Sequence, residues 1–233
     1  MPQLLLFDID GTLLNSGATS FHRFIDNVAD YLGKPIHYDG DHQMPGSTDP
    51  QIVKSFLLEN GCDANDVDVA VEKVLSRFDS FYAAHEEQVA KEMVVLPGVP
   101  ELLESLSKNT EFLLSLVTGN LRAVAQRKLR IANIDQYFNL DIAAFSDDSG
   151  IRTELPPIAL KRSEEFVNHP FNETERWVIG DAKGDYDCAQ TIQAKTLLVG
   201  TSGATVEELQ ALGATAVLPD LSNTAEVVRI LSN

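Results

Sequence analysis

Short apolar segments alternate with amphipathic helical patterns along most of this 233-residue chain, and the alternation limits the folds that it can adopt. Segments such as residues 4–7 and 112–117 are apolar on both faces, as expected of strands that are covered by helices on each side. This pattern predicts an α/β fold with a Rossmann-like parallel sheet. Strands are predicted at residues 3–9, 112–117, 140–145, 177–179 and 196–199, and a short edge strand at 216–218.

One connection is much longer than a crossover helix requires, namely the one between the first two predicted strands. It contains little β-type alternation. Helical patterns cover residues 19–32, 49–60 and 65–92. We therefore predict an all-helical cap domain at 16–95, inserted into an α/β core that is formed by 1–15 and 96–233. Gly and Pro punctuate the pattern at 15–17 and 96–98, where we expect hinges.

The charge balance restricts the partners of the chain. Lys and Arg number 18 against 35 Asp and Glu, which gives a formal net charge of −17. The sequence contains no basic patch that would offset this field, so nucleic acid and anionic membranes are excluded as expected partners. No apolar run approaches membrane-spanning length, and no basic region precedes the first strand, so we predict a cytoplasmic protein.

Two carboxylates follow the first predicted strand, in the segment Phe7-Asp8-Ile9-Asp10-Gly11-Thr12. Residues i and i+2 of a strand face the same side, so Asp8 and Asp10 can converge at the carboxyl end of the sheet, where open α/β folds bind ligands. Repulsion between two close carboxylates raises one pKa and favours a divalent cation. The alternative is that both aspartates belong to a solvated turn.

The Asp-x-Asp-Gly-Thr motif resembles the first motif of the haloacid dehalogenase superfamily, and with the inserted cap the resemblance covers essentially the whole chain. It implies that Asp8 attacks phosphorus and forms an aspartyl-phosphate. Asp10 would protonate the leaving oxygen and then activate water. Gly11 would lie against the bound substrate.

A second motif follows the next predicted strand, in Val117-Thr118-Gly119-Asn120. The Thr118 hydroxyl and the backbone N–H groups after it can bind phosphate oxygens at a helix N-terminus. We therefore predict substrate contacts for Thr118, Gly119 and Asn120, with a catalytic role for Thr118. Asn120 is alternatively an ordinary helix N-cap.

A third motif, Gly180-Asp181-Ala182-Lys183-Gly184-Asp185, resembles the acidic motif of the superfamily. The resemblance implies Mg²⁺ as cofactor, with Asp8, the Asp10 carbonyl and Asp181 as its ligands. Few carboxylates suffice because Mg²⁺ keeps several waters. Asp185 would support the metal site from behind these ligands, or alternatively would serve as a helix N-cap.

The chain departs from the superfamily pattern where a lysine usually precedes a proline and the next helix. The segment here is 149–158, and Arg152 is its cation. A guanidinium binds phosphate oxygens well, so Arg152 is predicted to take the lysine's catalytic role, the alternative being a surface arginine. Lys161 lies well inside the following helix and is the weaker candidate.

The predicted cap contains the segment 45–50, Pro-Gly-Ser-Thr-Asp-Pro, which looks like the substrate-facing loop of phosphoglycolate-phosphatase-like caps. Contact of Gly46 with substrate follows from this resemblance. The same residues also suit a helix start with Asp49 as N-cap and Pro50 at the first helical position.

The sequence thus predicts a magnesium-dependent phosphatase of a small-molecule phosphate ester, with a phosphoglycolate-like or sugar phosphate substrate. A phosphomutase of the same superfamily uses the same two aspartates and remains an alternative. A non-catalytic phosphate-binding regulatory protein is the other, because a fold alone does not guarantee activity. The sequence predicts no oligomeric state.

Overall fold

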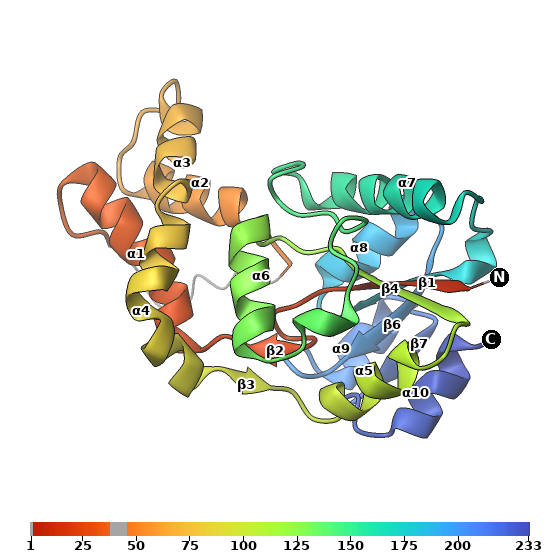
Figure 1. Ribbon diagram of the computed structural model, residues 1–233. Coiled ribbons are helices and arrows are strands. Elements are labelled where there is room, and N and C mark those ends of the chain that lie inside the picture. The colour runs from red at the N-terminus through yellow and green to blue at the C-terminus, as the bar shows by residue number, and fades with distance from the viewer. Residues whose placement is uncertain (1, 38–45) are drawn as a thin grey trace.

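A computed structural model describes residues 2–37 and 46–233 of the chain. Over these residues, the central sheet has five parallel strands in the order β4-β1-β5-β6-β7 (Figure 1). The strands are β1 (Gln3–Phe7), β4 (Phe112–Leu116), β5 (Arg176–Gly180), β6 (Lys195–Val199) and β7 (Ala216–Leu218). The predicted parallel α/β fold is therefore confirmed. No helix in the described ranges is long and apolar enough to cross a membrane.

Helices cover both faces of this sheet. Strand β1 pairs with β4 and with β5, so neither of its edges is open. The helices of the core are α5 (Val99–Ser107), α6 (Arg122–Ile131), α7 (Leu155–Val167), α8 (Lys183–Thr191), α9 (Val206–Ala211) and α10 (Thr224–Leu231). Single turns of 3₁₀-helix occur at η1 (Asp135–Tyr137), η2 (Arg152–Glu154) and η3 (Glu173–Glu175).

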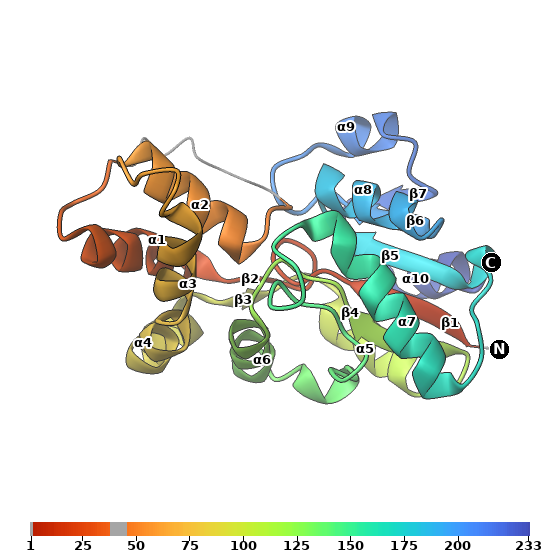
Figure 2. The same ribbon diagram turned by 90° about the horizontal axis from the view of Figure 1, so that it is seen from above.

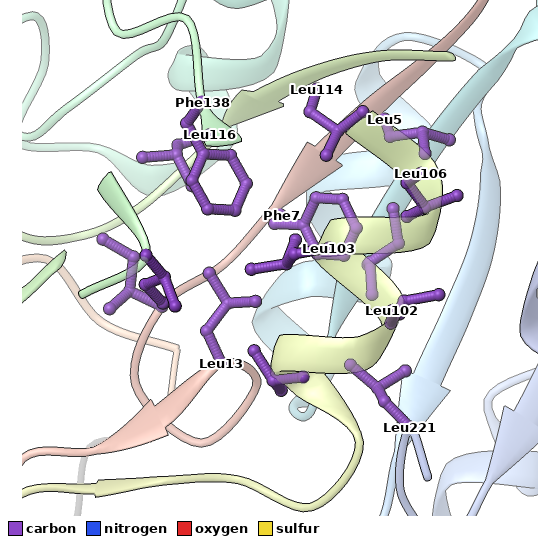
Figure 3. Packing of buried hydrophobic residues seen from close by; sticks show 14 of the residues in the cluster. Leu5, Phe7, Leu13, Leu102, Leu103, Leu106, Leu114, Leu116, Phe138 and Leu221 are labelled. Atoms are coloured by element: carbon purple, nitrogen blue, oxygen red, sulfur yellow. The ribbon is translucent and has the colours of Figure 1, made fainter. Parts of the chain in front are cut away.

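The alternation of side chains along β1 separates two hydrophobic clusters. Leu5 and Phe7 point to one face, where Leu102, Leu103 and Leu106 of α5 pack against them (Figure 3). Leu4 and Leu6 point to the other face and pack with residues of α7 and α8. Because both faces are buried, every residue of the Leu4–Phe7 run is apolar and has no exposed surface.

Helices α1 to α4 lie together at one end of the molecule, beside the sheet (Figures 1 and 2). They are α1 (Gly17–Leu32), α2 (Asp49–Glu59), α3 (Val67–Leu75) and α4 (Phe78–Glu92). We call residues 16–93 the helical insertion. It begins after β2 (Leu14–Asn15) and ends before β3 (Val94–Val95), and these two short strands pair antiparallel. The insertion has a hydrophobic cluster of its own, centred on Phe24, Phe56 and Phe78.

Helix α6 lies between the core and the helical insertion. Its Val124 belongs to the cluster of the insertion, whereas Ala125 and Leu129 belong to the cluster beneath the sheet. Arg127 of the same helix forms ion pairs with Asp79, at 2.8 Å, and with Glu86, at 3.1 Å, both on α4. The same helix therefore packs against both parts.

Two predicted elements are wrong in detail. Residues 140–145 do not form a strand: only Ala144 bridges to Val117, although the run is largely buried. An apolar run indicates that a segment is buried but not that it pairs as a strand, and here a single residue pair bridges to the sheet. The helical pattern at 65–92 is interrupted at residues 76–77, where a turn separates α3 from α4.

Candidate active site

The three sequence motifs meet at the carboxyl ends of neighbouring strands. Asp8 follows β1, Thr118 follows β4 shortly after its end, and Asp181 follows β5. Because β1 lies between β4 and β5, parallel strands place these residues at one edge of the sheet. A cavity of about 430 Å³ opens there, between the sheet and the helical insertion. Its lining includes the predicted site residues Asp8, Asp10, Gly11, Gly46, Gly119, Asn120, Arg152 and Asp181.

Asp8, Asp181 and Asp185 form a buried carboxylate cluster. Each residue offers an oxygen that lies within 4.8 Å of an oxygen from the other two. Burial raises the pKa of Asp8 and of Asp181, and the negative charges of their neighbours raise them further, whereas Arg152 acts in the opposite direction on Asp8. This set of oxygen donors with excess negative charge fits a hard divalent cation such as Mg²⁺.

Asp185 lies one step behind the cavity and does not line it. Its Oδ2 accepts hydrogen bonds from the backbone N–H groups of Asp181 and Ala182, both at 3.1 Å. Ala182 is the N-cap residue of α8 and Asp181 precedes it, so Asp185 bonds back to them from the first turn of the helix and is not its N-cap residue. A Cβ on Gly180 would lie 2.1 Å from the Asp185 carboxyl carbon, which explains the glycine before Asp181.

Two hydroxyl groups hold Asp181 in place. Thr12 donates a hydrogen bond to its Oδ1 at 2.9 Å, and the Ser202 hydroxyl donates to its Oδ2. Gly11 has a positive φ of 85°, and a Cβ there would lie 2.6 Å from the Asp181 carboxylate. The Gly-Thr part of the first motif therefore fits around the aspartate of the third.

Arg152 is buried and faces the carboxylate cluster. Its Nη2 lies 3.0 Å from Asp8 Oδ1 and 2.5 Å from Asp185 Oδ1. Burial opposes its charge, but the two carboxylates outweigh that effect and raise the pKa of Arg152, so the guanidinium stays charged. The surface alternative for Arg152 is thus wrong. Lys161, by contrast, is 77% exposed and pairs with Glu165.

Asp10 lies on the other side of Asp8 and has a separate set of partners. Its Oδ2 accepts hydrogen bonds from Lys128 Nζ at 2.5 Å and from Asn120 Nδ2 at 2.8 Å, and Ser16 donates to its Oδ1. Burial acts to raise the pKa of Asp10, but Lys128, the Ser16 hydrogen bond and the charge of Arg23 outweigh it and lower that pKa to about 2. Asp10 is therefore ionised in the free protein.

Lys128 was not predicted as a site residue. It lies on α6, its side chain is 1% exposed, and it lines the cavity. Its position four residues after the buried Val124 places it on an apolar helix face. A charged residue at such a position is the signal that sequence reasoning missed, because lysine is almost never fully buried unless it is paired.

The structure contradicts the alternative interpretation of the second motif, in which Asn120 caps a helix. Asn120 is not a helix N-cap, because α6 begins at Arg122 and is preceded by Leu121 at the cap position. The Asn120 side chain instead connects Thr118 Oγ1, Asp10 and Lys128. Thr118 is fully buried and lies behind the lining of the cavity, where its hydroxyl accepts from the Asn120 amide at 2.9 Å.

The segment 46–50 of the helical insertion contacts the core directly; Pro45 lies outside the described residues. The N-cap of α2 is Thr48 and not Asp49, because Thr48 forms a capping box with Gln51. Pro50 is accordingly the second helical residue. The Thr48 hydroxyl also donates to the Gly150 carbonyl at 2.6 Å.

Asp49 has a different role from the predicted cap. Its backbone N–H donates to the Gly119 carbonyl at 2.7 Å, and its Oδ2 accepts from the Leu121 N–H at 3.0 Å. Its Oδ1 forms a buried ion pair with Arg23 of α1 at 2.8 Å. The start of α2 is thereby attached both to the second motif and to α1.

Comparisons with known proteins agree with this arrangement. A phosphoglycolate phosphatase of Pseudomonas fluorescens is 28% identical over 197 residues, which cover 84% of this chain and 68% of that protein. The pyrophosphatase PpaX of Bacillus mycoides is 23% identical over 195 residues, covering 84% and 82%. A solved hydrolase structure from Pseudomonas syringae shares the fold, with a TM-score of 0.72 at 24% identity over 97% of this chain and 98% of that one.

A family model described as haloacid dehalogenase-like hydrolase matches residues 5–199, which include the carboxylate cluster, Asp10 and Arg152. The predicted resemblance is thereby confirmed, and the chain is a member of the haloacid dehalogenase-like hydrolases.

Proposed function

We propose that this hydrolase is a magnesium-dependent phosphatase of a small phosphorylated metabolite, with Asp8 as nucleophile. The observation that supports this best is the position of Asp8: a buried carboxylate that lines the cavity, next to the oxygen donors of Asp181 and to the Arg152 guanidinium. A nucleophile in this setting can approach a phosphoryl group whose charge is neutralised on two sides.

The donor set suits Mg²⁺. Asp8, Asp181 and the backbone carbonyl of Asp10 would hold the ion, and Asp185 would support it through Asp181 and Arg152. When bound, Mg²⁺ would neutralise charge on the phosphoryl oxygens and orient them. Arg152 would bind the same group as a charge-assisted donor.

The chemistry of the residues proceeds in two halves. Asp8 Oδ attacks phosphorus, the bond from phosphorus to the leaving oxygen breaks, and Asp10 gives that oxygen a proton. Asp10 then takes a proton from water, which attacks the aspartyl-phosphate and releases inorganic phosphate. Free Asp10 is in the ionised form that the second half needs. A bound phosphate dianion raises the pKa of a nearby carboxylate, which favours the protonated form for the first half.

The cavity limits the substrate to a small molecule. Helices of the insertion provide Ser20, Arg23, Phe24 and Ile52 to its wall. We propose that residues 16–95 act as a cap that covers a bound metabolite, and that the substrate is phosphoglycolate-like or a sugar phosphate. The two relatives named above differ in the substrates their names give, so sequence similarity alone does not identify the substrate of this chain.

Arg23 favours a leaving group with a second negative charge. Its Nη1 donates to the Ser20 carbonyl at 2.5 Å and its Nη2 pairs with Asp49, but its buried Nε has no partner among the described residues. This guanidinium lines the cavity close enough to Asp10 to lower its pKa. A carboxylate of the leaving group could form a charge-assisted hydrogen bond with this guanidinium.

The test is phosphate release from a panel of small phosphate esters, with Mg²⁺ or with a chelator, by the wild type and by Asp8→Asn. Asp187→Asn is the matched control, because Asp187 is an acidic residue on α8 whose ion pair with Lys183 is largely exposed. We expect turnover that needs Mg²⁺, is lost in Asp8→Asn and persists in Asp187→Asn. A wild type that is silent towards the whole panel would refute the phosphatase proposal, and isomerisation of a sugar phosphate without phosphate release would identify a mutase.

A further inference from the structure

The buried ammonium of Lys128 has a place in the site that the sequence motifs do not explain. It reaches Asp10 across 118 positions of sequence, from a helix that belongs to the layer between core and insertion. Its side chain is 1% exposed, and the described residues within hydrogen-bond distance of its Nζ are Asp10, at 2.5 Å, and Asn120, at 2.7 Å. Both partners line the cavity.

Two of the buried cations that line the cavity, Arg152 and Lys128, contact different carboxylates. Arg152 contacts Asp8 and Asp185, on the side of the carboxylate cluster. Lys128 contacts Asp10, on the side that faces Ser16 and the helical insertion. The proposed nucleophile, Asp8, is thus paired with Arg152, and the proposed acid and base, Asp10, is paired with Lys128.

A lysine with a purely structural role would be energetically unfavourable at this position of α6. Val124, Ala125 and Leu129 around it are buried and apolar, and burying an ammonium there requires that its full charge be compensated. An apolar residue would fill the same helix position without that desolvation. Among the residues that the structure describes, the lysine Nζ bonds to a single carboxylate oxygen, Oδ2 of Asp10. Asn120 bonds both to the lysine and to the same oxygen.

This triangle fixes how Asp10 is oriented. Lys128 Nζ and Asn120 Nδ2 both donate to Oδ2, and Ser16 donates to Oδ1, so rotation of the carboxylate would break several bonds at once. A proton donor must lie in a defined direction from the leaving oxygen, and small misplacements of such groups reduce rates strongly. The geometry supplies that orientation from α6.

We propose that Lys128 is a positioning residue for Asp10, and that it acts on the protonation of the leaving oxygen through Asp10. This inference rests on the proposed phosphatase function. It predicts that loss of Lys128 impairs the reaction most where the leaving group most needs a proton, because good leaving groups depart without help from an acid.

The experiment measures kcat/KM with Mg²⁺ for phosphate esters of graded leaving-group acidity, from an acidic phenol to an alkyl alcohol. For phosphate release through an aspartyl-phosphate, kcat/KM reports the steps up to the departure of that group. Lys128→Met keeps the length and apolar stem of the side chain. We expect a loss of a few-fold for the acidic phenol and on the order of 100-fold for the alkyl ester. Lys161→Met, at the exposed lysine of α7, is the matched control and should match the wild type for every ester.

A double variant separates positioning from a structural effect. If Lys128 acts through Asp10, then Asp10→Asn combined with Lys128→Met should be no slower than Asp10→Asn alone. Equal losses for all esters, or losses that multiply in the double variant, would overturn the proposal. If thermal unfolding shows that Lys128→Met does not fold, Asn120→Leu is the second variant. It removes the other donor to Asp10 Oδ2 and should give the same dependence on the leaving group.

The wild type separates the two failures. Turnover by the wild type that is lost in Asp8→Asn, together with an unselective effect of Lys128→Met, leaves the phosphatase proposal intact and removes Lys128 from it. A wild type without turnover on any ester removes both.

Discussion

Replacing Arg152 by methionine should make the stability of the protein more dependent on Mg²⁺ and should lower its activity. The substitution keeps an unbranched apolar stem but removes the guanidinium and with it both ion pairs of Nη2, at 3.0 Å to Asp8 and 2.5 Å to Asp185. Breaking a buried pair by removing one partner typically destabilises a protein by about 3–5 kcal/mol. We expect that loss in the absence of metal, and a smaller loss with saturating Mg²⁺, because a cation bound at the same carboxylates compensates their charge.

The activity of this variant should fall even where its stability is restored. A charge-assisted contact to the transferring phosphoryl group is worth about 2 kcal/mol or more, which corresponds to roughly a 30-fold loss of kcat/KM. Arg152→Lys should stay within about tenfold of the wild type. The reason is that both ion pairs use the same nitrogen, so a single ammonium can meet both carboxylates.

Two measurements check this reasoning. Denaturant unfolding of Arg152→Met, with chelator and with Mg²⁺, gives the change in the free energy of unfolding, and kinetics with an aryl phosphate give kcat/KM. A value of kcat/KM within twofold of the wild type for Arg152→Met would remove Arg152 from the site. An equal loss of stability in both solutions would show that the metal binds away from these carboxylates.

Mg²⁺ at about 100 times its dissociation constant should raise the melting temperature by roughly 5–10 °C, since ligand binding then adds about 2.7 kcal/mol to the free energy of unfolding. Asp181→Asn should abolish this shift. An unchanged shift for the variant, measured by calorimetry, would place the ion elsewhere. Arg23→Met should lower kcat/KM for phosphoglycolate by roughly tenfold or more relative to 2-hydroxyethyl phosphate, which is similar in size but has no carboxylate. Parallel losses for the two esters would mean that Arg23 does not contact the leaving group. Burial raises the pKa of the Cys188 thiol to about 12, so at pH 8 it is protonated, and a maleimide should label the less buried Cys62 alone until the protein is unfolded; labelling of Cys188 in the native protein, located by peptide mapping, would contradict its burial.

Some parts of the site could be predicted because the sequence places them at strand ends. Asp8 and Asp181 each follow a short apolar run, and the carboxyl ends of parallel strands meet at one edge of a sheet. Arg152 could be proposed because the superfamily pattern that the chain resembles has a cation in this segment. The pairing of Lys128 with Asp10 could not be predicted, because the two residues are distant in sequence and only the packing of α6 against the core brings them together.

The fold shows the same division between local and tertiary information. The parallel strands and the long helical insertion follow from the apolar runs and their spacing. Residues 140–145 resemble a strand in sequence because they are apolar and largely buried. Whether such a run forms a strand depends on how much of the neighbouring strand is free to pair with it, and here the pairing is limited to one bridge. Asp49 looks like a helix cap, yet the tertiary pair with Arg23 uses its side chain.

The pairing of β2 with β3 makes the helical insertion an exchangeable module. Leu14 faces Val95 and Asn15 faces Val94, so the chain leaves the core and returns to it at points about 5 Å apart. Any segment whose two ends lie that close together could in principle be exchanged at this position without disturbing the sheet. It would have to match α6, whose Val124 and Arg127 contact the insertion, and also the second motif, where Gly119 and Leu121 bond to Asp49. Under the proposed role of the insertion as a substrate cap, evolution could change the substrate by altering this segment and the surfaces it contacts, while the carboxylates at the strand ends keep their positions.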